Sequence, residues 1–414
     1  MLAEIITIGD ELLLGQTVDT NSAWMGGQLA AHGIRVHRIT SISDEADAIL
    51  VALDEALSRV DFVLVTGGLG PTRDDITKET LAAYFGTELV MNDAVLETIT
   101  NWFSGRGFDM LEANRHQAML PEACEVLINP RGTAMGMWFE REVDQKVVVS
   151  MPGVPYEMKG LMLEEVFPRV DRHWKLPTRY HRTLLTQGVG ESYLSELVLE
   201  WEERLESRGV SIAYLPAPGQ VRVRLSAVDE DAKAAKNRVE VEVAAFLKMA
   251  GDYVVSELDE SLGSAVVHSL AKQHLTLSTA ESCTGGAIAA SITSVPGSSK
   301  VFKGSVVAYD NHVKETMLGV SSVVLLEHGA VSEAVVCQMA LGVKERMGTD
   351  YAVATSGVAG PDGGTKEKPV GTVWIALAGP KGVESKCLSL GNNRARNIER
   401  SVREALAWII RTAK

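Results

Sequence analysis

The sequence is poor in cysteine, and it has no apolar run long enough to span a membrane. Its four cysteines, Cys124, Cys283, Cys337 and Cys387, include no CxxC pair, which argues against a disulfide framework or a structural zinc site. The first residues, MLAEIITIGDE, lack the basic flank of a signal peptide. No segment has the length of a transmembrane helix. We therefore expect a cytoplasmic protein that does not contact membranes.

Positive charge is also scarce. The 40 lysines and arginines are outnumbered by 54 aspartates and glutamates, which gives a formal net charge of -14. Proteins that bind the phosphate backbone of nucleic acids need a basic face, so a nucleic-acid partner is not expected. What the chain does have is length. Its 414 residues, of which 46% are hydrophobic, suffice for more than one core and predict several domains.

The first part of the chain, residues 1–172, alternates between strand and helix patterns. LAEIITIG and DFVLVTG are short apolar runs that end in glycine, the pattern of parallel strands covered on both faces. One helix is predicted before Gly33, its stop, and another after Asp44, which lies near its N-cap. A strand in KVVVSMPG and a final helix in GVPYEMKGLMLEEVF close the unit. This alternation predicts an open α/β sheet.

The middle and last parts follow different patterns. In QVRVRLSAV the alternation of apolar residues with arginines predicts a half-exposed antiparallel strand. With a long helix after it, residues 175–255 are interpreted as a small α+β connecting domain. Residues 258–414 begin with a helix capped by Ser261 and contain several strand patterns and a final amphipathic helix. The predicted fold class is α/β, with two α/β sandwich domains joined by the small α+β domain.

Polar segments of the last domain each follow a predicted strand. They are TAESCTGGA with Ser282 and Thr284, AYDNHVK with Tyr309 and Lys314, and ATSGVAG. Ligands bind at the carboxyl ends of the strands in open α/β sheets, so we expect these segments to meet at one edge. The competing interpretation is a tight turn in which Ser282 or Thr284 only caps the next helix.

These segments, together with HGAVSE, SGVAGPDGG and KPVGTVW, resemble the C-terminal domain of CinA proteins, the nicotinamide mononucleotide deamidase family. The resemblance implies hydrolysis of the carboxamide of nicotinamide mononucleotide to nicotinate mononucleotide and ammonia, without a cofactor. By similarity, Ser282 is the nucleophile, Lys314 is its base, and Tyr309 orients the base or relays the proton. Cys283 is the rival nucleophile, because a thiolate is intrinsically more reactive than a hydroxyl.

The same resemblance implies how the substrate is bound. The residues concerned are Thr284, Gly285, Gly286, Ser356, Gly357, Arg394 and Arg396. The first three would offer backbone N–H groups to the oxyanion, and the next two would hold ribose or phosphate. An arginine would bind the phosphate with its guanidinium fork. The segment GNNRARN departs from the family's GDR, so both arginines remain candidates. From the residues alone, Lys314 and the arginines could equally be solvated, and Tyr309 could be a half-buried aromatic.

A second candidate site follows a strand of the first domain. In TGGLGPTRDDIT, a glycine-rich turn can present N–H groups to a phosphate, and Asp74 and Asp75 can hold a divalent cation, although paired aspartates are also common helix caps. With IGDELLLGQTVDTN, EANRHQAMLP and NPRGTAMG, this segment resembles the molybdopterin-binding-like domain of CinA proteins. The resemblance implies metal-dependent hydrolysis of the pyrophosphate in ADP-ribose. The implied site residues are Glu11, Asp19, Asn21, Gly67, Gly68, Asp74, Asp75, Asn114 and Gly132.

The middle domain resembles the KH-like connector of full-length CinA proteins, but it lacks the GXXG loop that clamps a nucleic-acid backbone. We therefore expect a homodimeric, bifunctional enzyme of pyridine-nucleotide salvage whose partners are nicotinamide mononucleotide and ADP-ribose. The alternative is a nucleotide- or pterin-binding regulatory protein linked to competence or DNA damage. The joint presence of Ser282, Tyr309 and Lys314 favours an enzyme, because a binding pocket needs neither a nucleophile nor a base.

Overall fold

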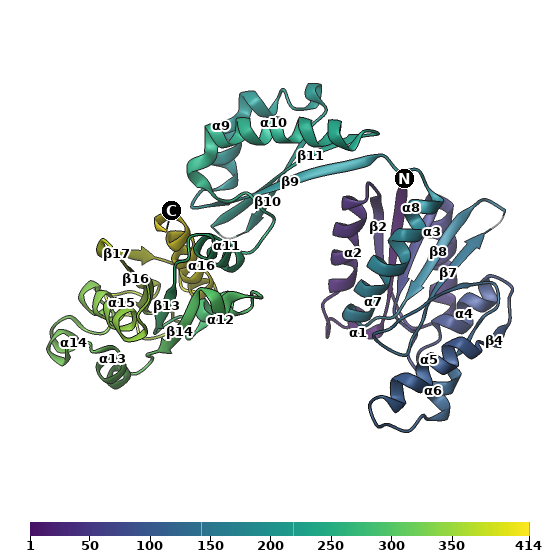
Figure 1. The fold of residues 1–414 in the computed structure, drawn as a ribbon, viewed down its shortest axis with the longest axis horizontal. Helices are drawn as coiled ribbons and strands as arrows, with labels where there is room; N and C mark the ends of the chain where they lie inside the picture. Colours follow the sequence, from purple (N-terminus) through teal and green to yellow (C-terminus); the bar gives the residue numbers. More distant parts are fainter. Residues whose placement is uncertain (142, 218, 414) are drawn as a thin grey trace. The chain divides into compact units, whose positions relative to one another are not determined.

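The computed structural model describes residues 1–141, 143–217 and 219–413. The chain divides into two compact units, Met1–Tyr180 with Val228–Lys236, and His181–Ala227 with Asn237–Lys414 (Figure 1). Within the described ranges, no helix combines the length and the hydropathy that a membrane crossing needs.

The first unit is built on a six-stranded sheet with the order β2-β1-β3-β8-β7-β6. Its strands are β1 (Leu2–Ile8), β2 (Arg35–Ile42), β3 (Phe62–Thr66), β6 (Glu125–Leu127), β7 (Gly136–Arg141) and β8 (Lys146–Met151). The first four in this order run parallel, as the short apolar runs predicted, whereas β7 is antiparallel to β8 and β6 is antiparallel to β7. β4 (Leu89–Met91) and β5 (Met119–Pro121) form a separate sheet.

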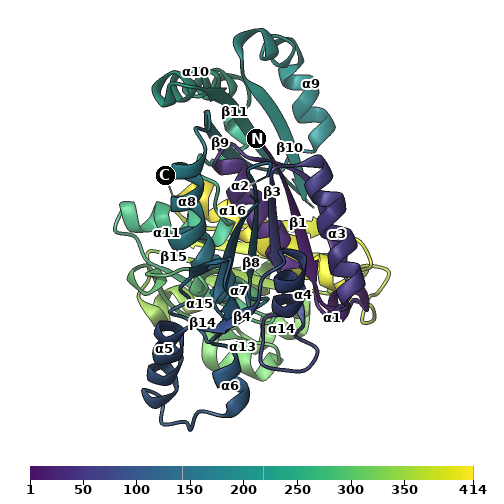
Figure 2. The same cartoon turned by 90° about the vertical axis from the view of Figure 1, so that its right-hand side faces the viewer.

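Helices cover both faces of the six-stranded sheet (Figures 1 and 2). One face carries Ile6 and Val65 and packs against α3 (Ala46–Arg59), α4 (Thr77–Tyr84) and α5 (Asp93–Ser104). The other face carries Ile5 and Leu64 and packs against α2 (Thr20–Ala31), α7 (Pro155–Leu161) and α8 (Phe167–His173). The short helices α1 (Asp10–Leu13) and α6 (Glu112–His116) belong to the loops. Burial on both faces confirms the α/β sandwich predicted for this domain.

Two local predictions in this unit are confirmed, each with a detail that the pattern did not show. The final helix forms, and a π-helical turn, η1 (Met162–Val166), joins α7 to α8. Asp44 lies next to Glu45, the N-cap of α3, but its carboxylate accepts a 3.0 Å hydrogen bond from the amide of Asp10 rather than from α3. Gly33 does follow α2, with a φ of +77° that favours glycine.

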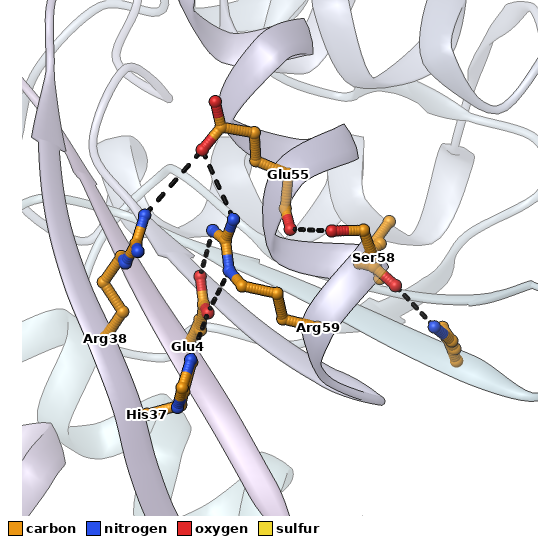
Figure 3. A network of polar contacts seen from close by, with 8 residues as sticks. Glu4, His37, Arg38, Glu55, Ser58 and Arg59 are labelled. Atoms are coloured by element: carbon orange, nitrogen blue, oxygen red, sulfur yellow. Dashed lines mark hydrogen bonds and ion pairs between the residues drawn. The ribbon is translucent and has the colours of Figure 1, made fainter.

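An ion-pair network around the buried Glu4 ties α3 to the first two strands (Figure 3). Glu4 in β1 is only 2% exposed, and its carboxylate accepts hydrogen bonds from Arg59 Nε at 2.8 Å and Nη2 at 2.9 Å. Arg59 also reaches Glu55, and His37 lies 3.9 Å from Glu4. The bidentate contact neutralises a carboxylate that would be costly to bury alone.

The second unit contains a four-stranded sheet with the order β10-β11-β9-β12. Its strands are β9 (Thr178–Gln187), β10 (Ser211–Ala217), β11 (Gln220–Asp229) and β12 (Val254–Ser256), and its helices are α9 (Glu191–Glu202), η2 (Glu206–Arg208), α10 (Ala232–Ala250) and η3 (Gly251–Tyr253). β11 pairs antiparallel with β10, and its Val221, Val223 and Leu225 are buried while Arg222 and Arg224 are partly exposed. The predicted half-exposed antiparallel strand is therefore confirmed.

The same unit contains the C-terminal sheet, with the order β14-β13-β15-β16-β17. Its strands are β13 (Leu277–Glu281), β14 (Phe302–Val307), β15 (Tyr351–Gly357), β16 (Thr372–Gly379) and β17 (Gly382–Ser389). β14, β13 and β15 are parallel, β16 is antiparallel to β15, and β17 is antiparallel to β16. Ile288, Leu270 and Leu406 pack on one face, and Leu318, Leu325 and Met339 on the other.

The helices of this domain form the two outer layers of a second sandwich (Figure 1). They are α11 (Leu262–Lys272), α12 (Ala287–Thr293) and α16 (Arg394–Thr412) on one face, and α13 (Asn311–Leu318), α14 (Ser322–His328) and α15 (Glu333–Met347) on the other, with a short η4 (Ser298–Lys300). Ser261 caps α11 as predicted, since its hydroxyl accepts a 3.1 Å hydrogen bond from the amide of Ser264.

Candidate functional sites

Three strand ends meet at one edge of the C-terminal sheet. Glu281, the last residue of β13, is in register with Val307 of β14 and Thr355 of β15. Backbone hydrogen bonds continue the pairing, from Ser282 N to Thr355 O at 3.0 Å and from Ala308 N to Glu281 O at 2.8 Å. The segments that follow these strands therefore lie side by side, as the sequence predicted.

The turn between β13 and α12 is organised by Glu281, which the sequence analysis did not single out. This carboxylate is fully buried, and its Oε2 accepts hydrogen bonds from Thr284 Oγ1 at 2.7 Å and Gly286 N at 3.0 Å. It also accepts hydrogen bonds from the amides of Ile288 and Ala289. Glu281 thus caps α12, and the interpretation of Ser282 or Thr284 as the cap is wrong. The sequence signal that could have identified Glu281 was a carboxylate close to the start of a helix, where the helix dipole favours negative charge.

The backbone N–H groups of this turn differ in whether they already donate a hydrogen bond within the protein. Gly285 N donates to Ser282 O at 3.1 Å, and Gly286 N donates to Glu281. The Thr284 N–H has no acceptor among the described residues. In this arrangement Thr284, rather than Gly285 or Gly286, carries the N–H that an oxyanion could use.

Lys314 is buried next to this turn. Its side chain is 1% exposed, and Nζ donates to the carbonyl oxygens of Ala308 at 2.8 Å and Tyr309 at 3.2 Å. Burial lowers the pKa of Lys314, and the negative charge of Asp310 opposes that shift. The interpretation of Lys314 as a solvated lysine is therefore wrong. A neutral amine has two N–H groups and one lone pair, so the two carbonyls would leave the lone pair free.

Ser282 and Cys283 differ in their surroundings. Cys283 is 6% exposed, and burial raises the pKa of its thiol to about 12, so the reactive thiolate is disfavoured near neutral pH. Ser282 is partly exposed, and its hydroxyl has no hydrogen-bond partner among the described residues. This contrast favours Ser282 over Cys283 as the nucleophile.

Arg394 joins the site, whereas Arg396 does not. Arg394, at the start of α16, donates from Nη2 to the hydroxyl of Tyr309 at 2.9 Å and from Nη1 to the carbonyl of Gly360 at 2.8 Å. Tyr309 is 61% exposed rather than half-buried. Arg396 is exposed, and only its backbone N–H is bonded, to Asn393 Oδ1 at 3.0 Å. The exposed Tyr309 and Arg394 form the open side of the site.

Ser356 and Gly357 have structural partners. Ser356 is 1% exposed and donates to the carbonyl oxygen of Ala330 at 2.7 Å. A Cβ at Gly357 would lie 2.7 Å from the carbonyl oxygen of Thr372. Both residues hold the loop after β15 against its neighbours, so a contact of either residue with substrate stays a prediction.

The candidate site of the first unit is a cavity of about 360 Å³ at the carboxyl ends of β1, β3 and β8. Of the predicted residues, its lining includes Glu11, Gly67, Gly68, Asp74 and Asp75. An adjoining cavity of about 100 Å³ is lined by Glu11, Asp19 and Asn21. Asn114 and Gly132 lie in neither lining.

Glycine is required in the loop after β3 by close backbone packing. Gly67 and Gly68 have φ values of +115° and +64°. A Cβ at Gly67 would lie 2.1 Å from the carbonyl oxygen of Ile8, and one at Gly68 would lie 2.1 Å from Thr77 Oγ1. The loop therefore follows a path that residues with a Cβ could not take.

Carboxylates gather on one side of this cavity. Burial raises the pKa of Asp44, and the charges of Asp10, Glu11 and Asp74 raise it further against a hydrogen bond from the Asp10 amide. Among the described residues that line the cavity, none is Lys, Arg or His. Sequence reasoning missed Asp44 as a site residue because its position predicted a cap.

We tested whether these carboxylates suit a divalent cation. The described residues contain no group of three or more His, Cys, Asp or Glu side chains placed to hold a metal. Asp75 Oδ2 already accepts hydrogen bonds from the amide and hydroxyl of Thr72, so the predicted pair of Asp74 and Asp75 is not a preformed ligand set. Mg²⁺ commonly binds one or two carboxylates together with substrate phosphates. Asp74 with Asp44 or Glu11 fits that pattern.

The fold and the two sheet-edge sites define a three-domain α/β protein with a KH-like connector. Family models match residues 4–172 (probable molybdopterin binding domain), 181–255 (damage-inducible protein CinA KH domain) and 259–413 (CinA C-terminal domain). The chain belongs to the CinA family.

Two relatives that match over the full length of the chain agree with this assignment. The chain is 46% identical over 412 residues to a CinA-like protein of Cytophaga hutchinsonii, covering 100% of this chain and 98% of the relative. It is 44% identical over 414 residues to one of Flavobacterium psychrophilum, covering 99% and 98%. A crystal structure of the competence/damage inducible protein CihA from Agrobacterium tumefaciens is 39% identical, covers 37% of this chain and 94% of its own, and has a TM-score of 0.36.

Proposed function

We propose that the C-terminal domain hydrolyses the carboxamide of nicotinamide mononucleotide to nicotinate mononucleotide and ammonia. The observation that carries this proposal is the buried Lys314, whose pKa is lowered beside the turn that presents Ser282. In a pocket that only binds ligand, a buried amine close to the turn that carries an unbonded hydroxyl has no evident purpose. In an amidase it is the base that the weakly nucleophilic hydroxyl needs.

The proposed reaction begins when neutral Lys314 takes the proton of the Ser282 hydroxyl as Oγ attacks the amide carbon. The Thr284 N–H stabilises the oxyanion, and the proton passes from Lys314 to the departing ammonia. Water then attacks the acyl-enzyme ester, with Lys314 again as base, to release the carboxylate. Arg394, held by Tyr309 and Gly360, binds the phosphate of the mononucleotide. The test is ammonia release from nicotinamide mononucleotide by the full chain without added metal.

We further propose that the first domain cleaves ADP-ribose to AMP and ribose 5-phosphate with a divalent cation. Support comes from a cavity that combines a glycine loop with Glu11, Asp44 and Asp74 and has no basic residue in its described lining. A bound cation would neutralise the diphosphate and make phosphorus more electrophilic. The test is AMP release from ADP-ribose with Mg²⁺ or Mn²⁺, compared with the same assay in chelator.

A pterin-binding role is the second candidate for the first domain, because the matching family model is described as a probable molybdopterin binding domain. A ligand that binds only the native state raises the melting temperature. Stabilisation of the full chain by a pterin phosphate but not by ADP-ribose would favour this role over the pyrophosphatase.

A further inference from the structure

Glu157, at the start of α7, is a carboxylate that neither proposed reaction uses. It is partly buried, and it lines the 360 Å³ cavity together with the glycine loop. The sequence segment around it, GVPYEMKG, predicted only a helix.

Neighbouring residues outside the cavity hold the Glu157 carboxylate in place. Asn129, which is 0% exposed, donates from Nδ2 to Glu157 Oε2 at 2.6 Å and to the carbonyl of Ala134 at 2.9 Å. Its Oδ1 accepts a hydrogen bond from the amide of Arg131 at 3.0 Å. A Cβ at Gly132 would lie 2.2 Å from Glu157 Oε2. The segment NPRG is thus shaped around the Glu157 carboxylate, which gives Gly132 a role other than direct substrate contact.

Glu157 has no compensating positive charge. No ion pair joins it to a Lys, Arg or His of the described chain, and the guanidinium of the nearby Arg131 is engaged by Glu164. Burial raises the pKa of Glu157, and the hydrogen bond from Asn129 only partly offsets it. A phosphate next to the free Oε1 would be repelled, so a ligand atom in that place should be an uncharged hydrogen-bond donor.

We propose that Glu157 is a specificity residue that accepts hydrogen bonds from ribose hydroxyl groups of a nucleotide in this cavity. The choice of a ribose-bearing ligand rests on the proposed pyrophosphatase function. In such a ligand the diphosphate requires cations or N–H groups, whereas the hydroxyl pairs of its riboses are uncharged donors. Carboxylates bind ribose hydroxyls in the same way in dinucleotide-binding folds.

The experiment is calorimetric titration of the full chain with ligands that differ by one hydroxyl. The pairs are AMP with 2′-deoxy-AMP and with 3′-deoxy-AMP, and ribose 5-phosphate with 2-deoxyribose 5-phosphate. They also distinguish the two riboses of ADP-ribose. The variants are Glu157→Gln and Gly132→Ala, whose new methyl group would displace the carboxylate. Asp171→Asn is the matched control, since it removes an exposed carboxylate from the nearby α8 and leaves the pairing of Arg131 with Glu164 intact.

The wild type should bind at least one hydroxylated ligand about 10- to 100-fold more tightly than its deoxy partner, as expected for a hydrogen bond to a charged group. Glu157→Gln and Gly132→Ala should erase most of that ratio, with little change in affinity for the deoxy ligand, and Asp171→Asn should keep it. Equal weakening of both ligands, or an unchanged ratio in a folded Glu157→Gln, would overturn the inference.

Hydrolysis assays separate this inference from the function on which it rests. If the wild type releases no AMP from ADP-ribose but Glu157→Gln erases the hydroxyl discrimination, the inference stands and the pyrophosphatase proposal fails. If AMP is released and Glu157→Gln lowers kcat without changing discrimination, the inference fails and Glu157 acts at the reacting phosphorus instead. Absence of binding of every hydroxylated ligand to the wild type would overturn both.

Discussion

The two candidate sites lie at the carboxyl edges of two α/β sheets, but they differ in how their charged side chains are compensated. In the C-terminal site, the buried Glu281 accepts hydrogen bonds from N–H and O–H donors, and the side-chain nitrogens of Lys314 and Arg394 donate to neutral oxygens. In the cavity of the first unit, Glu11, Asp44 and Asp74 repel one another with no basic residue in the described lining.

This difference indicates whether each site needs a bound cation in addition to its own residues. A site whose charges are already balanced can act on the uncharged carboxamide with its own nucleophile and base. A site with unbalanced carboxylates can accept a diphosphate only with a cation. The comparison therefore predicts that the two activities respond independently to mutation and to metal.

The largest effect is expected from Ser282→Ala. Removal of the nucleophile should lower ammonia release from nicotinamide mononucleotide by about 10⁴-fold, while Cys283→Ala should stay within a few fold of wild type. AMP release from ADP-ribose should not change in either variant. Both activities are measured on the same preparations. Loss of amidase activity in Cys283→Ala but not in Ser282→Ala would identify the thiol as the nucleophile and remove the stated role of Lys314.

The next largest effect is expected from Lys314→Met, which keeps the apolar stem and removes the amine. We expect a loss of about 10³-fold in kcat for ammonia release. Because the neutral amine is the active form and its pKa is lowered by burial, the wild-type rate should rise with pH, with a midpoint below the usual lysine pKa of about 10.4. That rise should be absent in Lys314→Met.

The control for this prediction is Lys303→Met, which removes an exposed lysine on the neighbouring β14. It should retain both the wild-type rate and the wild-type pH profile. A folded Lys314→Met that kept the pH-dependent rise would show that another group is the base.

A smaller effect, confined to the other site, is expected from Asp74→Asn. Loss of one carboxylate should lower AMP release by about 10²-fold and raise the Mg²⁺ concentration needed for half-maximal rate. Chelator should abolish AMP release and leave ammonia release intact. Asp47→Asn, an exposed substitution on α3, is the control and should show neither change. Equal sensitivity of both activities to chelator would contradict the proposal that only the site of the first domain requires a cation.

The sequence predicted the elements that position each site, because apolar runs ending in glycine depend only on local pattern. Thus the meeting of Ser282 with Tyr309 and Lys314 followed from the neighbouring ends of β13 and β14. The outer layers were harder to predict. A π-helical turn in MLEEV leaves no periodic signal that differs clearly from a helix.

Residues that act through distant or backbone partners could not be predicted. The Glu281 carboxylate accepts most of its hydrogen bonds from backbone amides at the start of the helix that follows it. Its role therefore depends on how the turn brings that helix back to the carboxylate. Glu157 depends on Asn129, which lies 28 positions away in the sequence. Asp44 has a sequence position typical of an N-cap, and only the packing of the loop after β1 shows that it bonds to Asp10 instead.

The smallest effect on activity is expected from Glu4→Gln, in the buried network of β1, β2 and α3. Glu4 lies in the first half of β1, away from the carboxyl end that lines the cavity. The change leaves the guanidinium of Arg59 with a neutral partner in place of a bidentate carboxylate. We expect the calorimetric transition of the first domain to fall by roughly 3–6 °C, with both activities within twofold of wild type at 25 °C. Glu55→Gln, at the exposed end of the network, should lower it by less. If Glu4→Gln changed AMP release without shifting the transition, the network would take part in the site rather than only support the sheet that carries it.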